Sequence, residues 1–121
     1  MQPSAELRVA AVQCPILWNE PEANLRYIAE QLRGQEAADL VVFPETILTG
    51  FSATAADYAD REGRQLEELT RLARRYGKAL AGSLLTALEG QLYNAFFLID
   101  EEGQVQLQPK RHLFAPGGER G

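Results

Sequence analysis

The sequence predicts an α/β fold built on a mixed sheet. Two short apolar runs, residues 7–13 and 38–44, are each followed by a segment in which apolar residues recur at helical spacing. Strand-like runs separated only by turn residues then fill 78–108. The alternating part is typical of parallel strands joined by right-handed crossovers, and the hairpins add antiparallel strands. The expected order is strand, helix, strand, helix, strand, strand, strand.

The first predicted strand, residues 7–13 (LRVAAVQ), is apolar at nearly every position, as is typical of a strand buried on both faces. The helix after it is expected to have Asn19 as its N-cap, with Glu22 three residues later and a proline in the first turn. Its apolar residues follow at helical spacing up to Gly34, the expected end of the helix: Leu25, Ile28 and Leu32.

The second predicted strand is the apolar run in ADLVVFP, residues 38–44. Pro44 has no N–H for a ladder hydrogen bond, so it ends the pairing. The second helix is predicted from Arg61 to Tyr76, with Gly77 in the position after its last turn. One face of this helix is apolar and includes Leu66, Leu69, Leu72, Ala73 and Tyr76.

The last third of the chain reads as two successive hairpins. Residues 78–86 and 92–100 are predicted strands around the turn 87–90, and residues 100–108 lead through a second turn into a fifth strand. The final segment, residues 115–121 (APGGERG), is expected to be loop. It ends without a closing element, so we expect residues 1–121 to be the N-terminal part of a single larger domain.

Composition excludes several classes of protein. Of 121 residues, 45% are hydrophobic and 24% charged, as in an ordinary globular domain. The net charge of −5 comes without a long run of either sign, so we expect neither a nucleic-acid nor a membrane partner. The single cysteine, Cys14, cannot form an internal disulfide, and no apolar stretch resembles a signal peptide. The cytoplasm is the expected compartment.

One acid stands where the second strand ends. Glu45 follows Phe43 and Pro44, in the place beyond a strand where open α/β sheets gather functional groups. An acid at such a place is commonly a turn residue that accepts backbone hydrogen bonds. Poor solvation beside the apolar neighbours would instead favour a general base. Position alone leaves both interpretations open.

A cation stands at the end of the fifth predicted strand. Lys110 follows Pro109, and an ammonium group in a dry site can stabilise negative charge on a carbonyl oxygen. The alternative is a solvated surface pair with Arg111. Glu45 and Lys110 are far apart in the sequence, so only the fold could bring them together.

These segments resemble the nitrilase superfamily of carbon-nitrogen hydrolases. LRVAAVQ is similar to the opening strand of that family, and DLVVFPETILTGF to the segment that carries its catalytic glutamate. LYNAFFLID followed by KRHLF is similar to the segment that carries its catalytic lysine. The resemblance runs from about Leu7 to Glu119. It implies an α-β-β-α sandwich fold, of which this chain would be roughly the first half.

The resemblance also implies a Glu-Lys-Cys triad. Glu45 would be the general base, and Lys110 would stabilise the tetrahedral intermediate. The cysteine nucleophile of the family lies a few tens of residues after the lysine, beyond this chain, so the chain alone is expected to be inactive. Cys14 does not match the nucleophile segment, and we interpret it as a small buried hydrophobe.

Two further residues match family positions. Asn94, in a Tyr-Asn pair, would support the catalytic loop, with ordinary strand polarity as the alternative. His112, the single histidine, would fix the lysine loop by packing or hydrogen bonding. No second ligand is suitably spaced for a metal, so neither a metal nor another cofactor is expected.

The substrate class follows from the branch that the chain resembles. TGFS, WNEPEANL and KRHLF look closest to the omega-amidase branch, which implies a small amide and makes 2-oxo acid omega-amides the candidate substrates. The family implies a homodimer or larger homo-oligomer at full length. The alternative is a non-catalytic α/β binding or interaction module, either a pseudoenzyme or a fragment. A nucleotide-binding fold is disfavoured because no glycine-rich loop follows the first strand.

Overall fold

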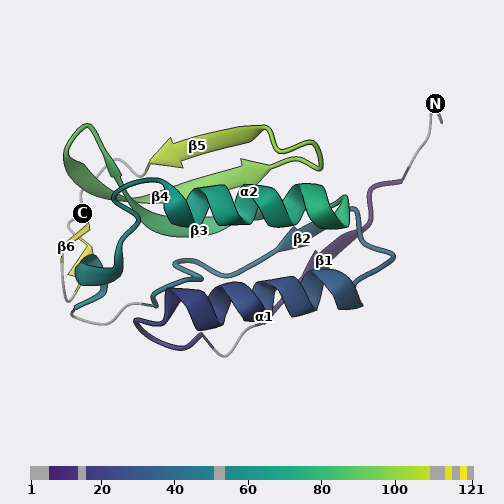
Figure 1. Ribbon diagram of the computed structural model, residues 1–121, viewed down its shortest axis with the longest axis horizontal. Coiled ribbons are helices and arrows are strands. Elements are labelled where there is room, and N and C mark those ends of the chain that lie inside the picture. The colour runs from purple at the N-terminus through teal and green to yellow at the C-terminus, as the bar shows by residue number, and fades with distance from the viewer. Residues whose placement is uncertain (1–5, 14–15, 51–53, 110–113, 116–117, 120–121) are drawn as a thin grey trace.

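The chain folds as a five-stranded sheet with both long helices on one of its faces (Figure 1). The computed structural model describes residues 6–13, 16–50, 54–109, 114–115 and 118–119. Its elements in chain order are β1 (Val9–Ala11), α1 (Pro21–Gly34), β2 (Leu40–Val42), the 3-10 helix η1 (Ala55–Tyr58), α2 (Arg64–Tyr76), β3 (Ala79–Leu88), β4 (Gln91–Ile99), β5 (Val105–Pro109), β6 (Phe114–Ala115) and β7 (Gly118–Glu119). The predicted α/β class with a mixed sheet is confirmed.

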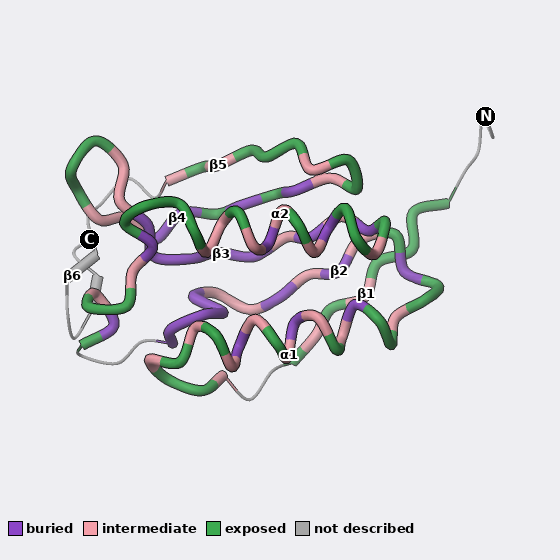
Figure 2. Tube along the Cα trace, viewed as in Figure 1, coloured by how far each residue is buried: buried purple, intermediate pink, exposed green. Residues whose placement is uncertain are grey.

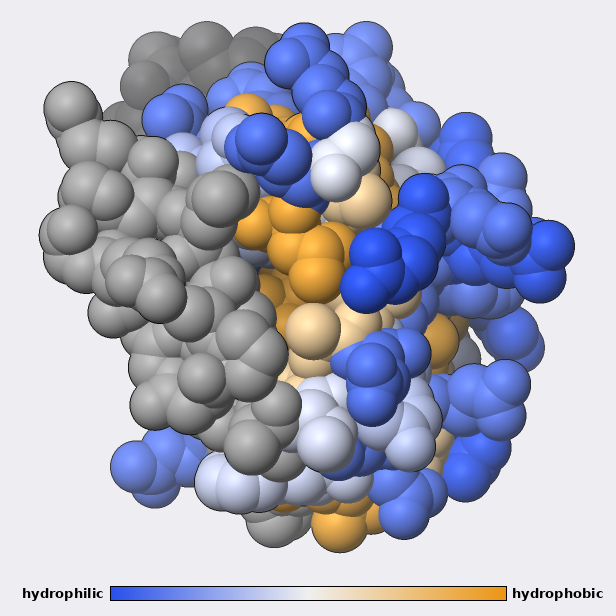
Figure 3. Space-filling view, turned by 90° about the vertical axis from the view of Figure 1, so that its left-hand side faces the viewer, coloured by the Kyte–Doolittle hydropathy of each residue, from blue (hydrophilic) through white to orange (hydrophobic). Residues whose placement is uncertain are grey.

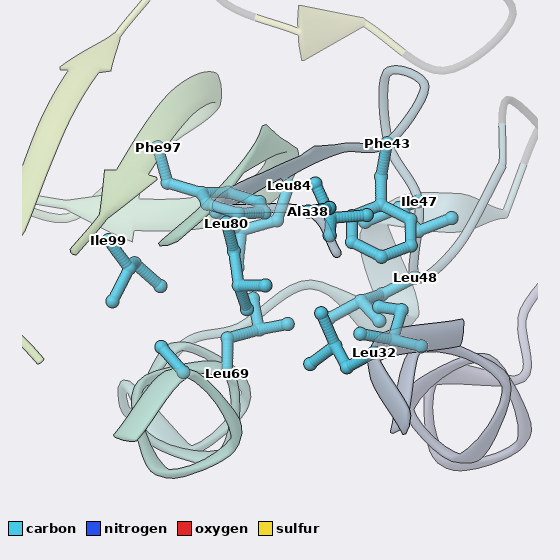
Figure 4. Packing of buried hydrophobic residues seen from close by; sticks show 13 residues of the cluster. Leu32, Ala38, Phe43, Ile47, Leu48, Leu69, Leu80, Leu84, Phe97 and Ile99 are labelled. Carbon is cyan, nitrogen blue, oxygen red and sulfur yellow. The ribbon is translucent and has the colours of Figure 1, made fainter. Parts of the chain in front are cut away.

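The order of strands explains why the helices share a face. The sheet runs β1-β2-β3-β4-β5, in which the first three strands are parallel and β4 and β5 are antiparallel to their neighbours. From β1 to β2, and again from β2 to β3, the chain moves to the next position in the sheet in the same direction. Helix α1 lies in the first connection and α2 in the second. Right-handed crossovers in one direction place successive helices on the same side of a sheet. Figure 4 shows the strands on one side of the core and both helices on the other.

The core lies between the sheet and the two helices. Leu69 of α2 and Leu80 of β3 point toward one another, and Leu32 of α1 lies beside Leu48 (Figure 4). All four side chains are 1% exposed or less. Burying one leucine contributes about 1.5–3 kcal/mol, so these contacts hold the helices on the sheet. Figure 2 shows buried positions recurring along both helices and through β3 and β4.

The other face of the sheet carries neither α1 nor α2; Ala55 of η1 packs against Leu85 there, but apolar side chains of β1 and β4 on this face are exposed. Val9 is 53% exposed, Phe96 44% and Leu98 41%. The strand register places one row of apolar residues across this face, consisting of Ala11, Val42, Ala81 and Leu98. The prediction that the first strand is buried on both faces is therefore wrong for this chain, because α1 and α2 cover only one face.

The start of α1 differs from the prediction. The helix begins at Pro21 after Glu20, which makes no side-chain cap hydrogen bond, so Asn19 is not the N-cap. Asn19 instead has a left-handed backbone, with φ of 61°, and its side-chain amide donates to the Thr54 hydroxyl at 2.8 Å. An N-cap residue typically has a β-region backbone, so the left-handed Asn19 is not in a capping conformation. The predicted end at Gly34 is confirmed.

The start of α2 is set by a residue outside the predicted helix. The Asp60 carboxylate accepts hydrogen bonds from the backbone N–H groups of Gln65 at 3.1 Å and Leu66 at 2.9 Å. The helix therefore begins at Arg64, later than the predicted start, and ends at Tyr76 with Gly77 left-handed as predicted. In none of the described ranges does a helix combine the length and apolar content needed to span a membrane.

The antiparallel part follows the prediction except at the turn 87–90, where Ala87 and Leu88 are paired residues of β3. β3 and β4 pair from Leu80↔Ile99 to Leu88↔Gln91, with only Glu89 and Gly90 between them, and β5 lies beside β4. The predicted loop at 115–121 is wrong in part, because β6 and β7 pair there as two-residue strands.

Candidate active site

Glu45 is the first residue of a turn, residues 45–50, that follows β2. The backbone N–H of Phe43 donates to the carbonyl of Ala81 in β3 at 2.8 Å, so strand pairing reaches Phe43 and stops at Pro44 as predicted. Glu45 is half-buried. It lies beyond the carboxyl end of a parallel strand, the place where open α/β sheets bind their ligands.

The sheet holds the backbone directly after Glu45. The N–H of Thr46 donates to the Ser83 hydroxyl oxygen at 2.8 Å, and the N–H of Ile47 donates to the Ser83 carbonyl at 3.3 Å. Thr46, Ile47 and Ser83 are all fully buried. A buried N–H without a partner would be costly, so Ser83 fixes where the turn leaves the sheet.

Thr46 carries backbone strain. Its φ is 48°, in the left-handed region, where a β-branched residue is an outlier. Such a conformation costs roughly 1–3 kcal/mol and persists only where the surroundings impose it. The Thr46 hydroxyl donates to the carbonyl of Glu45 at 2.8 Å. Strain of this kind gathers at functional sites, and here it lies next to the candidate base.

Helix α1 holds the other side of the turn. Asn24 is 3% exposed, and its side-chain amide donates to the carbonyls of Leu17 at 2.8 Å and Leu48 at 2.9 Å. Its side-chain oxygen accepts from the N–H of Leu17 at 3.0 Å. The N–H of Asn19 also donates to the carbonyl of Thr49 at 2.9 Å. The turn is therefore fastened to β3 on one side and to α1 and the segment before it on the other.

Asn94, the predicted support residue, is buried in β4 opposite Leu85. Ser83 is paired with Phe96 on the same two strands. Asn94 is thus the diagonal neighbour of Ser83 on one face of the sheet, at a Cβ separation of about 7 Å. The fold brings Asn94 and the turn of Glu45 to the same residue of β3.

Lys110, His112 and Cys14 lie outside the described residues. The residue before Lys110 is Pro109, which ends β5 and is paired with Ala95 beside Asn94. β5 lies two strand spacings from β3, about 10 Å. β5 therefore ends, at Pro109, at the end of the sheet where Glu45 lies.

This end of the molecule faces the viewer in Figure 3, where hydrophobic residues gather in the middle and hydrophilic residues lie along one side. A groove of about 620 Å³ lies elsewhere, between the first turns of α1 and α2 and beside η1, and neither Glu45 nor Asn94 lines it. Over the described ranges, no group of three or more His, Cys, Asp or Glu side chains is placed to hold a metal ion.

Sequence reasoning missed the residues that hold the turn. Ser83 is a single hydroxyl within the apolar run ALAGSLL, and Asn24 lies four residues before Ile28 on the buried face of α1. A polar residue in an apolar stripe has to find a partner when it is buried, and that is the signal that could have identified both.

The fold is a mixed α/β sheet, and a half-buried acid on a strained turn lies beyond its parallel strands, where proteins of this class bind their ligands. The chain belongs to the carbon-nitrogen hydrolase family, whose model matches residues 8–121.

Relatives of this chain include omega-amidases. The omega-amidase YafV of Escherichia coli (strain K12) is 32% identical over 108 residues, which are 89% of this chain and 42% of the relative. The 2-oxoglutaramate amidase of Bacillus subtilis (strain 168) is 31% identical over 112 residues, 88% of this chain and 43% of the relative. The chain spans less than half the length of the curated relatives it matches.

Solved structures match the fold. A CN-hydrolase superfamily protein from Xanthomonas campestris, with an arsenic adduct in its active site, has a TM-score of 0.79 and 32% identity, covering 95% of this chain and 47% of that protein. A mutant of the Nesterenkonia AN1 amidase from the nitrilase superfamily has a TM-score of 0.77 and 26% identity, covering 93% and 46%. Another structure of that amidase shows Michael addition of acrylamide at its active-site cysteine, with a TM-score of 0.76 and 25% identity over 92% of this chain and 46% of that one.

Proposed function

We propose that this chain is the N-terminal part of an omega-amidase that releases ammonia from a small 2-oxo acid amide. The observation that carries the proposal is Glu45 on a strained turn, held by Ser83 beyond a parallel strand, in a member of the carbon-nitrogen hydrolase family. The similarity to an omega-amidase and a 2-oxoglutaramate amidase supports the substrate class.

The proposed reaction uses three side chains. A cysteine thiolate, supplied by the part of the protein that follows this chain, attacks the amide carbonyl and forms a tetrahedral intermediate whose oxyanion Lys110 stabilises. Glu45, which has taken the proton of the cysteine thiol, gives it to the amide nitrogen, so that the C–N bond breaks and ammonia leaves. Glu45 then takes a proton from a water molecule that attacks the thioester, which releases the carboxylic acid and regenerates the thiol.

Two features support Glu45 rather than another acid as the base. Its half-burial limits solvation, and the backbone on its C-terminal side is fixed by two hydrogen bonds to Ser83. A base must be held within hydrogen-bond reach of the proton that it takes, so a rigid turn suits the role. Glu89, in the β3–β4 turn, is exposed to solvent and so has the environment of an ordinary surface carboxylate.

The test uses the full-length protein that contains these residues. Ammonia release from 2-oxoglutaramate is expected to fall by about 10³-fold or more in Glu45→Gln, because base catalysis and leaving-group protonation are lost together. Glu89→Gln is the matched control and is expected to keep activity within about twofold, since substitutions of exposed residues have small effects.

Retained ammonia release in Glu45→Gln would overturn the role of Glu45. A full-length protein that binds 2-oxoglutaramate without hydrolysing it would favour the non-catalytic binding module. The 121-residue chain alone is expected to release no ammonia, because it carries two of the three proposed roles. Assembly of the full-length protein into a homodimer or larger homo-oligomer, and its place in the cytoplasm, remain predictions.

A further inference from the structure

The hydroxyl of Ser83 contacts the residue after Glu45, and Ser83 lies on the same face of the sheet as Asn94. It accepts the N–H of Thr46, the residue after Glu45, at 2.8 Å. On the neighbouring strand, Asn94 is the diagonal neighbour of Ser83 on the same face of the sheet. The Ser83 side chain therefore holds the backbone next to the candidate base, on the face of the sheet that also carries Asn94.

The conformation of Thr46 makes this hydrogen bond consequential. A non-glycine residue with φ of 48° returns to a commoner conformation unless its surroundings hold it. The peptide N–H of Thr46 belongs to the same peptide plane as the carbonyl of Glu45, which accepts the Thr46 hydroxyl. Releasing this N–H would let that plane rotate, and the Glu45 carboxylate would move with it.

If the Ser83 hydroxyl were removed, bulk water could not take its place as the acceptor for the Thr46 N–H, because the site is buried. Ser83 and Thr46 are both fully buried, and Ser83 also accepts the N–H of Ile47 through its own carbonyl at 3.3 Å. In a Ser83→Ala variant the carbonyl bond survives and the hydroxyl bond is lost. The change is therefore confined to the peptide that joins Glu45 to Thr46.

We propose that Ser83 is a positioning residue for catalysis, whose hydroxyl fixes the Glu45–Thr46 peptide and so aims the Glu45 carboxylate. This inference rests on the proposed role of Glu45 as the general base. Ser83 touches no reacting atom. It acts by keeping the base within reach of its proton, where a misplacement of about 1 Å can cost about 100-fold in rate.

The test compares two hydroxyls of β3 in the full-length protein. Thr86 is also buried on β3, and its hydroxyl donates to the carbonyl of Asp60 at 3.0 Å, in contact with the segment between η1 and α2 rather than the Glu45 turn. Ser83→Ala is expected to lower kcat for 2-oxoglutaramate about 10- to 100-fold with KM within about twofold. Thr86→Val is expected to leave kcat within about twofold.

Two further readouts separate aiming from general destabilisation. In Ser83→Ala the acidic limb of the plot of kcat against pH is expected to move, because the environment of the base has changed, and in Thr86→Val the limb is expected to stay. Ser83→Thr, which restores a hydroxyl, is expected to recover most of the activity. If Ser83→Ala does not fold, Ser83→Cys replaces it, and its weaker acceptor is expected to give an intermediate kcat.

The outcomes are distinguishable from failure of the proposed function. If Glu45→Gln inactivates the enzyme but a folded Ser83→Ala or Ser83→Cys variant keeps wild-type kcat and pH profile, the positioning role is wrong. An equal loss of kcat in Thr86→Val would also overturn it, since the effect would then be general. Unchanged activity in Glu45→Gln would instead refute the proposed function.

Discussion

Two turns of this chain obtain their shapes by different means. The turn 100–104 between β4 and β5 is self-contained, because Asp100 accepts the N–H groups of Glu102 and Gln104 on one side-chain oxygen, both at 2.9 Å. The turn 45–50 between β2 and η1 also has internal hydrogen bonds, from the N–H groups of Thr49 and Gly50 to the Thr46 carbonyl. In addition it is held by Asn24 and Ser83, which lie 24 and 37 residues from their partners. Local sequence determines the first turn, whereas the second also depends on the tertiary fold.

This difference bears on function. A turn built from its own residues keeps its shape in water, whereas a turn held by distant side chains can maintain a strained residue such as Thr46. Glu45, the candidate base, lies on the turn 45–50, which contacts with distant residues hold in place. Substitutions that loosen each turn should therefore have unequal effects on stability.

The largest effect is expected at Asn24. Asn24→Ala removes one buried hydrogen bond to Leu48 and two part-buried hydrogen bonds to Leu17, with a loss of about 3 kcal/mol in the free energy of unfolding. Urea unfolding followed by circular dichroism measures this change. A loss below about 1 kcal/mol would mean that water replaces Asn24 and that helix α1 does not fasten the turn.

An intermediate effect is expected at Gly50. Its φ is 72°, and an added Cβ would lie 2.3 Å from the Trp18 ring, so Gly50→Ala should cost about 2 kcal/mol and displace the indole. Gly103 in the other turn has φ of 90°, but its Cβ would meet only the Arg74 side chain at 3.1 Å. Gly103→Ala should cost about 1 kcal/mol.

The fluorescence of Trp18, the single tryptophan, reports on the same pair of variants. Its emission should change in Gly50→Ala and remain unchanged in Gly103→Ala, alongside the melting temperatures. Equal destabilisation with unchanged emission in both variants would show that backbone conformation alone, and not the contact with Trp18, sets the cost at Gly50.

The smallest effect is expected at Asp100. Asp100→Ala removes the acceptor for Glu102 and Gln104, but both residues are exposed, so water can satisfy their N–H groups and the loss should be about 0.5–1 kcal/mol. The same urea titration measures it. A loss equal to that of Asn24→Ala would remove the distinction between the two turns.

Much of the fold could be predicted from the sequence because its signals are local. The apolar face of α2, the hairpin turn before Gln91 and Pro44 as the end of pairing each depend on a few neighbouring residues. The errors involve contacts across the fold. Asn19 has a left-handed backbone and binds Thr54, 35 residues away, instead of capping α1. Asp60 sets the start of α2 from a segment that also pairs with Thr86.

The candidate site divides in the same way. Glu45 could be proposed from its place after a strand, and Lys110 from its place in a family motif. Ser83 could not, because its role depends on the register that sets β3 beside the turn and beside Asn94. A serine in an apolar strand reveals that it has a partner but does not reveal which one.

The strand order also distributes the entropic cost of folding unevenly. Pairing of β4 with β5 closes only the short turn between Ile99 and Val105, whereas pairing of β2 with β3 joins Leu40 to Ala79 and closes a loop that contains the whole of α2. For a flexible chain the longer closure costs roughly 1.5–2 kcal/mol more. The antiparallel strands therefore pair between segments that are close in the sequence. The parallel pairing of β2 with β3, which places the Glu45 turn beside Ser83, requires segments that are distant in the sequence to come together.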